Sequence, residues 1–238
     1  MSNLRRRDWI LIILLAISSL ICVRLGFWQL ERLQQRMDRN TSITDQLNAS
    51  VKPFSLAELD YQRVTLEGNY LHEHEILLQN RSLDEVAGFH VITPLQIDDG
   101  SVILIDRGWI PYETGAAFAL DCFQMTESVR IEGVLLPSQP QPRWRFLSDP
   151  IPKPGDPPLK TWRLIDIKGI QRQMPFLLHH QFFSLIHIEP IREPQPEPDF
   201  QPDLSNGPHL SYAIQWFSFA AIAIIGGAIM LQRSRRKQ

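Results

Sequence analysis

The sequence predicts a membrane protein in which two transmembrane α-helices, one near each terminus, flank an α+β domain dominated by an antiparallel β-sheet or partly closed barrel. Residues 9–28 and 209–231 are long apolar runs, and the second carries no charge after His209. About twenty such residues cross a hydrocarbon core. Between them, residues 51–189 contain short segments in which apolar side chains alternate with polar ones, as in half-buried strands.

Residues 1–8 carry three arginines and precede the first apolar run. A cleaved signal peptide and an uncleaved anchor both begin in this way. No small-residue cleavage pattern follows, so an uncleaved transmembrane helix is favoured over residues 9–28. Residues 29–50 read as a continuation of this helix out of the membrane, since Leu30, Leu33 and Met37 recur at helical spacing.

A basic stripe is predicted where the first span ends. Arg24, Trp28, Arg32 and Arg36 follow one another at four-residue spacing and share one helix face. Such a stripe suits two roles: contact with lipid headgroups, which interfacial tryptophan and arginine favour, or docking of a partner or anionic group.

The predicted β domain has at least five strands, rich in Val, Ile and Leu. Asp98, Asp99 and Gly100 form a typical hairpin turn between two of them. The strands are expected at residues 63–70, 75–80, 88–95, 101–109 and 128–135, with further strand at 161–165 and 184–188, and short helices at 113–120 and 164–173.

Two segments concentrate proline and are expected to be extended. Residues 137–158 form a predicted loop between strands, and residues 190–208 a stiff tether to the second span. Asn206 and Pro208 suit the start of the helix that follows.

Charge predicts the orientation of both spans. Residues 232–238 are basic, whereas residues 194–210 contain no lysine or arginine. The positive-inside rule therefore places both termini in the cytosol and the central domain on the opposite side. With too few residues before the first span for a presequence, we expect a bacterial inner membrane protein with a periplasmic domain.

Several classes of function find little support. A formal net charge of −2 does not indicate the excess of positive charge that is typical of nucleic-acid-binding proteins. No nucleophile motif or glycine-rich phosphate loop is present, so an enzyme is not expected. Cys22 and Cys122 imply neither a disulfide framework nor a zinc site. His72 and His74 would share a face on a strand and hold a metal, although a polar turn explains them equally well.

His209 differs from the other histidines because it lies at the mouth of a membrane helix among aromatic residues. An imidazole in that position suits axial ligation of haem. It also suits an ordinary interfacial residue that bonds the backbone or headgroups, and the physics alone favours this second interpretation.

Taken together, four motifs resemble the Surf1 (Shy1) family of cytochrome c oxidase assembly factors, in order and over essentially the whole chain. They are Leu25-Gly26-Phe27-Trp28-Gln29 with Arg32; Arg81-Ser82 with Gly88-Phe89 and Val91-Ile92-Thr93-Pro94-Leu95; Asp106-Arg107-Gly108-Trp109-Ile110-Pro111; and Asn206, Pro208-His209-Leu210, Tyr212-Ala213 and Gln215-Trp216-Phe217.

The resemblance implies a non-enzymatic assembly factor that assists delivery or insertion of haem a into oxidase subunit I, with a haem a synthase as a further partner. His209 matches the family's proposed haem contact, and Tyr212 and Trp216 would border the porphyrin. The alternative is a scaffold that holds subunit I in the membrane and never binds haem. Gly108 to Pro111 are expected to be fold elements rather than a contact surface.

Overall fold

The computed structural model describes residues 6–55, 59–142, 144, 148–150, 152–153 and 156–236. Two compact units divide the chain: Met1–Thr44 with Asp203–Gln238, and Asp45–Pro202. The side chains of residues 6–7 and 234–236 are not described either, so the basic clusters expected at both termini lie mostly outside the described residues. The principal elements are α1 (Arg6–Asn48), β1 (Lys52–Pro53), β2 (Arg63–Tyr70), β3 (Ile76–Leu83), β4 (Val86–Ile97), β5 (Val102–Pro111), α2 (Tyr112–Ala116), β6 (Val129–Pro137), β7 (Thr161–Trp162), α3 (Ile167–Ile170), β8 (Leu178–Glu189) and α4 (His209–Arg236).

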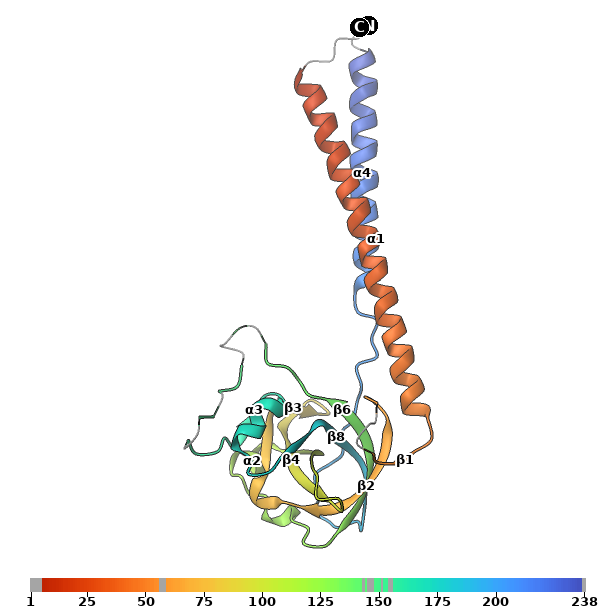
Figure 1. Cartoon of the computed structure of the whole chain (residues 1–238). Coiled ribbons are helices and arrows are strands. Elements are labelled where there is room, and N and C mark those ends of the chain that lie inside the picture. The colour runs from red at the N-terminus through yellow and green to blue at the C-terminus, as the bar shows by residue number, and fades with distance from the viewer. Residues whose placement is uncertain are drawn as a thin grey trace. The chain divides into compact units, whose positions relative to one another are not determined.

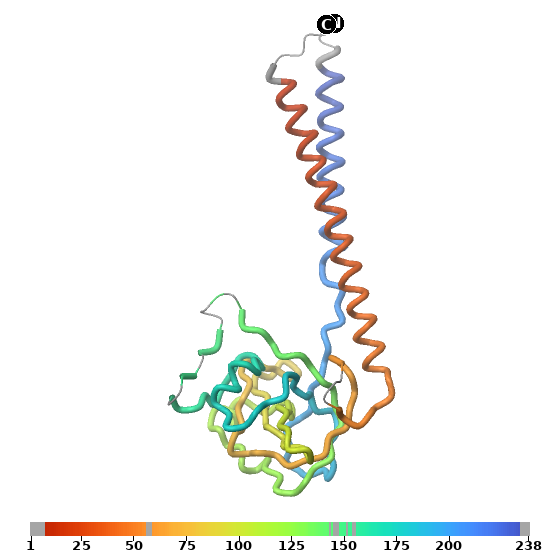
Figure 2. The backbone as a smooth tube through the Cα atoms, viewed as in Figure 1, coloured from red at the N-terminus to blue at the C-terminus, as the bar shows by residue number. Residues whose placement is uncertain are grey.

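The first unit is an antiparallel pair of helices, α1 and α4, which lie side by side (Figures 1 and 2). Small side chains line the contact, since Ala213 and Ala220 are buried and the Ser19 hydroxyl donates to the Ala220 carbonyl at 3.4 Å. Small residues let two helix backbones approach closely. Ser19 therefore packs in this contact, whereas Ala16 is exposed.

In the described part of the chain, two helices are long and apolar enough to cross a membrane. Asp8–Asn48 and His209–Arg233 contain windows of mean hydropathy 2.6 and 1.9. Only 11% and 6% of these windows are buried inside the protein. Apolar helices with so little protein cover are unlike the core helix of a soluble domain, whose apolar face packs against other elements.

The second unit is built on a closed five-stranded barrel. The strand order β2–β6–β8–β5–β4 returns to β2, because β2 pairs with both β6 and β4. β1 extends the sheet beside β2, and β3 and β7 extend it beside β4. Figure 1 shows the strands curling around a common interior. Closure pairs the strand edges that an open sheet would expose.

One pairing differs from the antiparallel sheet that the alternation predicts. β8 lies between β6 and β5 and runs parallel to β5, with Leu104 opposite Phe182 and Asp106 opposite Ser184. Parallel neighbours need a long crossover connection, and the chain between β5 and β8 provides it, since it includes β6, which runs antiparallel to β8. The short β1 and β7 are also parallel to their neighbours.

Two main clusters of apolar side chains hold the second unit together. The first cluster fills the space enclosed by the barrel strands, because alternate residues of each strand point inward. The second cluster surrounds the fully buried Trp162 and includes residues of α3. The first consists of Val64, Leu66, Tyr70, Leu95, Ile103, Ile105, Met125, Val129, Ile131, Leu135, Phe183, Leu185 and Ile188.

The predicted elements are present, with altered ends. β2 matches its predicted bounds, and Gly100 has φ +83° in the expected hairpin turn. β7 stops at Trp162 because the next two backbone N–H groups donate to the Asp149 carboxylate and not to a neighbouring strand. The two short helices are likewise shorter than predicted, at five and four residues.

The proline-rich segment 190–208 is shared between the two units. Its first part belongs to the β unit, where Glu197 and Trp109 exchange two backbone hydrogen bonds of 2.7 and 2.9 Å. Its last part belongs to the helix unit, where Asp203 forms an ion pair with Arg36 at 2.5 Å. This segment is therefore held by backbone hydrogen bonds at Glu197 and by an ion pair at Asp203.

Candidate functional site

His209 is the first residue of α4 and contacts α1. Its Nδ1 lies 2.9 Å from the side-chain carbonyl oxygen of Gln29, and Gln29 is only 9% exposed. A carbonyl oxygen can only accept, so Nδ1 is the donor in this contact, and a neutral ring would then present Nε2 with a free lone pair. The helix pair thus holds one imidazole in a defined orientation at the start of the second span.

Glycine keeps space open beside that imidazole. Gly207 has φ +65°, and a Cβ added there would lie 3.6 Å from His209 Nε2. Elsewhere in the helix pair, Gly26 of α1 lets Phe217 approach so closely that an added Cβ would meet the ring at 2.7 Å, and Phe27 packs edge-on against Phe217 with centroids 5.4 Å apart. The imidazole therefore has an edge that no side chain of residue 207 covers.

The two other predicted haem neighbours lie on the same helix face as His209, three and seven positions further along. Tyr212 is 46% exposed, and Trp216 is half-buried with its ring edge-on to Phe219 at 6.0 Å. No hydrogen bond joins either side chain to His209 in the part of the chain that the structure describes. The structure thus places the three side chains along one face of α4.

The start of α4 differs in one detail from the sequence prediction. The Pro208 carbonyl accepts from the Tyr212 N–H at 3.1 Å, so Pro208 occupies the cap position. The Asn206 side-chain oxygen accepts instead from Asn40 of α1 at 3.2 Å. Asn206 therefore joins the segment before α4 to α1 and does not cap the helix.

The basic stripe of α1 is only partly continuous. Arg24, Trp28 and Arg32 are exposed, and Arg24 makes a loose 3.9 Å contact with Glu31. Arg32 donates to Gln35 at 2.9 Å. Arg36 turns away from the stripe toward Asp203, so three residues and not four form the exposed face.

His72 and His74 do not share a strand face. They lie in a one-turn 3₁₀ helix between β2 and β3, which is the polar turn that the sequence left open as an alternative. His74 packs edge-on against Phe176, whereas the Met125 N–H donates to His72 Nε2 at 2.9 Å. In the described residues no three metal-ligating side chains gather, so this pair has no third ligand there.

His72 belongs to a buried polar cluster that pattern reasoning missed. One oxygen of Glu75 accepts from His72 Nδ1 at 2.7 Å, the Thr93 hydroxyl at 2.7 Å and Arg107 at 3.0 Å. Arg107 also donates to the Phe123 carbonyl at 2.6 Å, and both charged side chains are 2% exposed. A buried carboxylate needs such a partner because burial strips its hydration.

Tyr70 closes this cluster on the barrel side. The Arg107 guanidinium lies over its ring, 4.7 Å from the centroid. Burial raises the pKa of Tyr70 to about 12, an effect that the Arg107 charge partly opposes. The inward direction of Arg107 could be predicted from the sequence. Arg107 lies two residues after Ile105 on a strand whose alternate residues face the interior.

The neighbouring residues of the same motif face the other side of β5. Both oxygens of Asp106 lie 3.0 Å from Nδ1 of the buried His90, and Oδ1 also accepts from the Gly108 N–H at 3.1 Å. Nearby, burial lowers the pKa of Arg81, and the Asp106 charge partly offsets that effect. Arg81 donates to backbone carbonyls of β3 and of Arg163. These residues connect neighbouring strands of the β unit.

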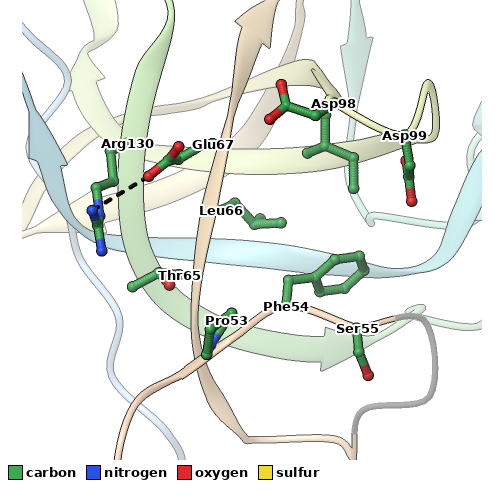
Figure 3. A pocket seen from close by; sticks show the side chains of 10 residues that line it. Pro53, Phe54, Ser55, Thr65, Leu66, Glu67, Asp98, Asp99 and Arg130 are labelled. Carbon is green, nitrogen blue, oxygen red and sulfur yellow. Dashed lines mark ion pairs between the residues drawn. The ribbon is translucent and has the colours of Figure 1, made fainter.

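A shallow cavity of about 330 Å³ lies between β1, β2 and the β4–β5 turn (Figure 3). Two of its acidic side chains are engaged: Glu67 pairs with Arg130 at 3.3 Å, and Asp99 accepts from Ser101, which lowers the pKa of Asp99. Phe54 and Leu66 supply its apolar surface, as Figure 3 shows. Among the described residues that line this cavity, no group of three side chains that could hold a metal ion is present.

A closed β-barrel unit combined with a pair of apolar helices, one of which begins with an oriented histidine, defines a two-helix membrane-type protein with a β-rich body. The chain belongs to the SURF1 family, whose model matches residues 16–221. It is 29% identical over 221 residues to a SURF1-like protein of Monosiga brevicollis, covering 84% of this chain and 79% of that one. It is 26% identical over 242 residues to an uncharacterized SURF1-like protein of Mycobacterium bovis, with 94% and 83% covered. A SURF1-like protein of Rickettsia bellii is 24% identical over 231 residues, with 88% and 86% covered.

Proposed function

We propose that this protein is a non-enzymatic assembly factor for cytochrome c oxidase that receives haem a and assists its insertion into subunit I. Membership of the SURF1 family supports the general class. The haem proposal depends on one observation, the imidazole of His209 held by Gln29 at the start of α4. Haem iron would supply the coordination chemistry, and His209 is the residue of this chain that would ligate it.

The aromatic residues around His209 fit a flat apolar ligand. Tyr212 and Trp216 present rings on the His209 face of α4, and both are accessible in part. Aromatic rings pack favourably against extended π-systems. Subunit I would accept the haem, and a haem a synthase is the partner expected to supply it.

The test is an absorption spectrum of the full chain, purified in mild detergent from cells that also express a haem a synthase. We expect a haem a band in the wild type and loss of most of it in His209→Ala, because the side chain that would ligate the iron is then absent. His187→Ala is the matched control, since that histidine is exposed and lies in the β unit, and it should keep the band.

Absence of the band from the wild type would contradict haem binding and favour the scaffold that only holds subunit I. Subunit I in the same eluate would then support that alternative. Normal haem a content and oxidase activity in membranes of a deletion strain would contradict both forms of the proposal.

We also propose that the protein lies in a bacterial inner membrane with both termini in the cytosol and the β unit in the periplasm. The antiparallel helix pair supports the placement of both termini on one side, because two spans return the chain to the side of the membrane where it started. Cys122 is exposed in the β unit, and Cys22 lies within α1. A membrane-impermeant maleimide should label Cys122 in intact spheroplasts but not in a Cys122→Ser control. Labelling that requires lysis would reverse the orientation.

The exposed stripe of Arg24, Trp28 and Arg32 is proposed to contact anionic lipid headgroups. These side chains lie at and just beyond the end of the apolar run, where guanidinium and indole groups favour the interface. Arg24→Gln with Arg32→Gln should reduce the anionic phospholipid that copurifies. Loss of subunit I with unchanged phospholipid would identify the stripe as a docking face for that partner instead.

A further inference from the structure

We propose that Gln29 is a positioning residue that fixes the tautomer of His209 and so keeps Nε2 unprotonated and able to bind iron. This inference rests on the proposed function, because it gives His209 a defined binding nitrogen. It assigns Gln29 a role that its side chain exerts only through His209.

The geometry of the contact carries the first step. Gln29 is 9% exposed on the face of α1 that packs against α4, and its side-chain carbonyl oxygen lies 2.9 Å from His209 Nδ1. Buried polar side chains are nearly always hydrogen-bonded. His209 is the partner that Gln29 has at this position, so the bond serves both residues.

The chemistry of imidazole gives the second step. A neutral ring carries one N–H, and the partner of one nitrogen decides which nitrogen keeps the proton. With the Gln29 carbonyl as acceptor, the proton stays on Nδ1 and Nε2 presents a lone pair. Histidine ligands of metals usually have such an acceptor on the other nitrogen, and its removal typically weakens metal binding 10- to 100-fold.

Gly207 gives the third step, because it borders the nitrogen that Gln29 leaves free. Its positive φ and missing Cβ leave the Nε2 edge of the ring without a side chain from the preceding turn. An added Cβ would stand 3.5 Å from Cδ2 and 3.6 Å from Nε2. The two residues thus act on opposite edges of one imidazole: Gln29 occupies Nδ1 and Gly207 leaves Nε2 accessible.

The experiment compares wild type, Gln29→Leu and Gln29→Glu as full chains in mild detergent. Leucine keeps the apolar bulk but removes the acceptor, whereas glutamate restores an acceptor oxygen. Gln34→Leu is the matched control, because Gln34 lies on the same helix but is exposed and bonds Asp38. His209→Ala assigns the His209 signals.

The first readout is the tautomer of His209 in haem-free protein, measured by ¹⁵N NMR of labelled histidine. We expect the Nδ1–H form in wild type, Gln29→Glu and Gln34→Leu, and a shift to the Nε2–H form in Gln29→Leu. An Nε2–H form in the wild type, or no change in Gln29→Leu, would overturn the proposal.

The second readout is haem affinity from an absorption titration. Gln29→Leu should weaken binding by about 10- to 100-fold, with recovery in Gln29→Glu. Unchanged affinity in Gln29→Leu would overturn the role of Gln29 in binding. If no variant binds haem while the tautomer still depends on Gln29, the proposed function fails and the control of the His209 tautomer stands.

Discussion

Replacing Arg107 with methionine is expected to lower the free energy of unfolding of the β unit by about 3–5 kcal/mol. Arg107 and Glu75 are each 2% exposed and lie 3.0 Å apart. Methionine retains the bulk of the side chain but leaves the Glu75 carboxylate buried without its cation. The Phe123 carbonyl also loses its 2.6 Å donor.

Chemical denaturation of the full chain in mild detergent, followed by near-ultraviolet circular dichroism, measures this loss. Arg130→Met is the matched control: its ion pair with Glu67 is exposed, so we expect a change within about 1 kcal/mol. Glu75→Gln combined with Arg107→Met should recover much of the loss, because the buried charge is then absent. Equal stability of Arg107→Met and Arg130→Met would show that the buried pair does not hold the barrel.

Replacing Gly108 with alanine is expected to destabilise the β unit by about 3 kcal/mol, combining backbone strain with lost hydrogen bonds. Gly108 has φ +116°, and an added Cβ would lie 2.1 Å from the Glu197 carbonyl oxygen. That contact cannot persist, so the segment around Glu197 must move away from β5. The two backbone hydrogen bonds between Trp109 and Glu197 would then break.

Gly100→Ala provides a close comparison. Its φ of +83° imposes a similar backbone cost, but an added Cβ would meet nothing within 4 Å. We expect a loss of only about 1–2 kcal/mol there. Denaturation measures both losses, and limited proteolysis of residues 190–202 should accelerate in Gly108→Ala alone. Unchanged proteolysis would mean that the Glu197 contact does not anchor the segment.

The candidate site was only half predictable. His209, Tyr212 and Trp216 stand out in the sequence because an imidazole and aromatic rings open a long apolar run. Gln29 does not, since a glutamine among Glu31, Arg32 and other polar residues resembles an ordinary exposed side chain. Its role depends on α4, which lies 180 residues away along the chain.

Local pattern determined much of this protein: both apolar helices, the β-rich body between them, the bounds of β2 and the turn at Gly100. These features depend on residues that are near each other in sequence, so hydrophobic periodicity and turn residues predict them. The tertiary structure alone decided the closure of the barrel, the parallel entry of β8 beside β5, the burial of Arg107 with Glu75 and the bond between Gln29 and His209. Each of these joins residues that are distant along the chain, and no local pattern specifies which strand edge or buried polar partner a segment meets.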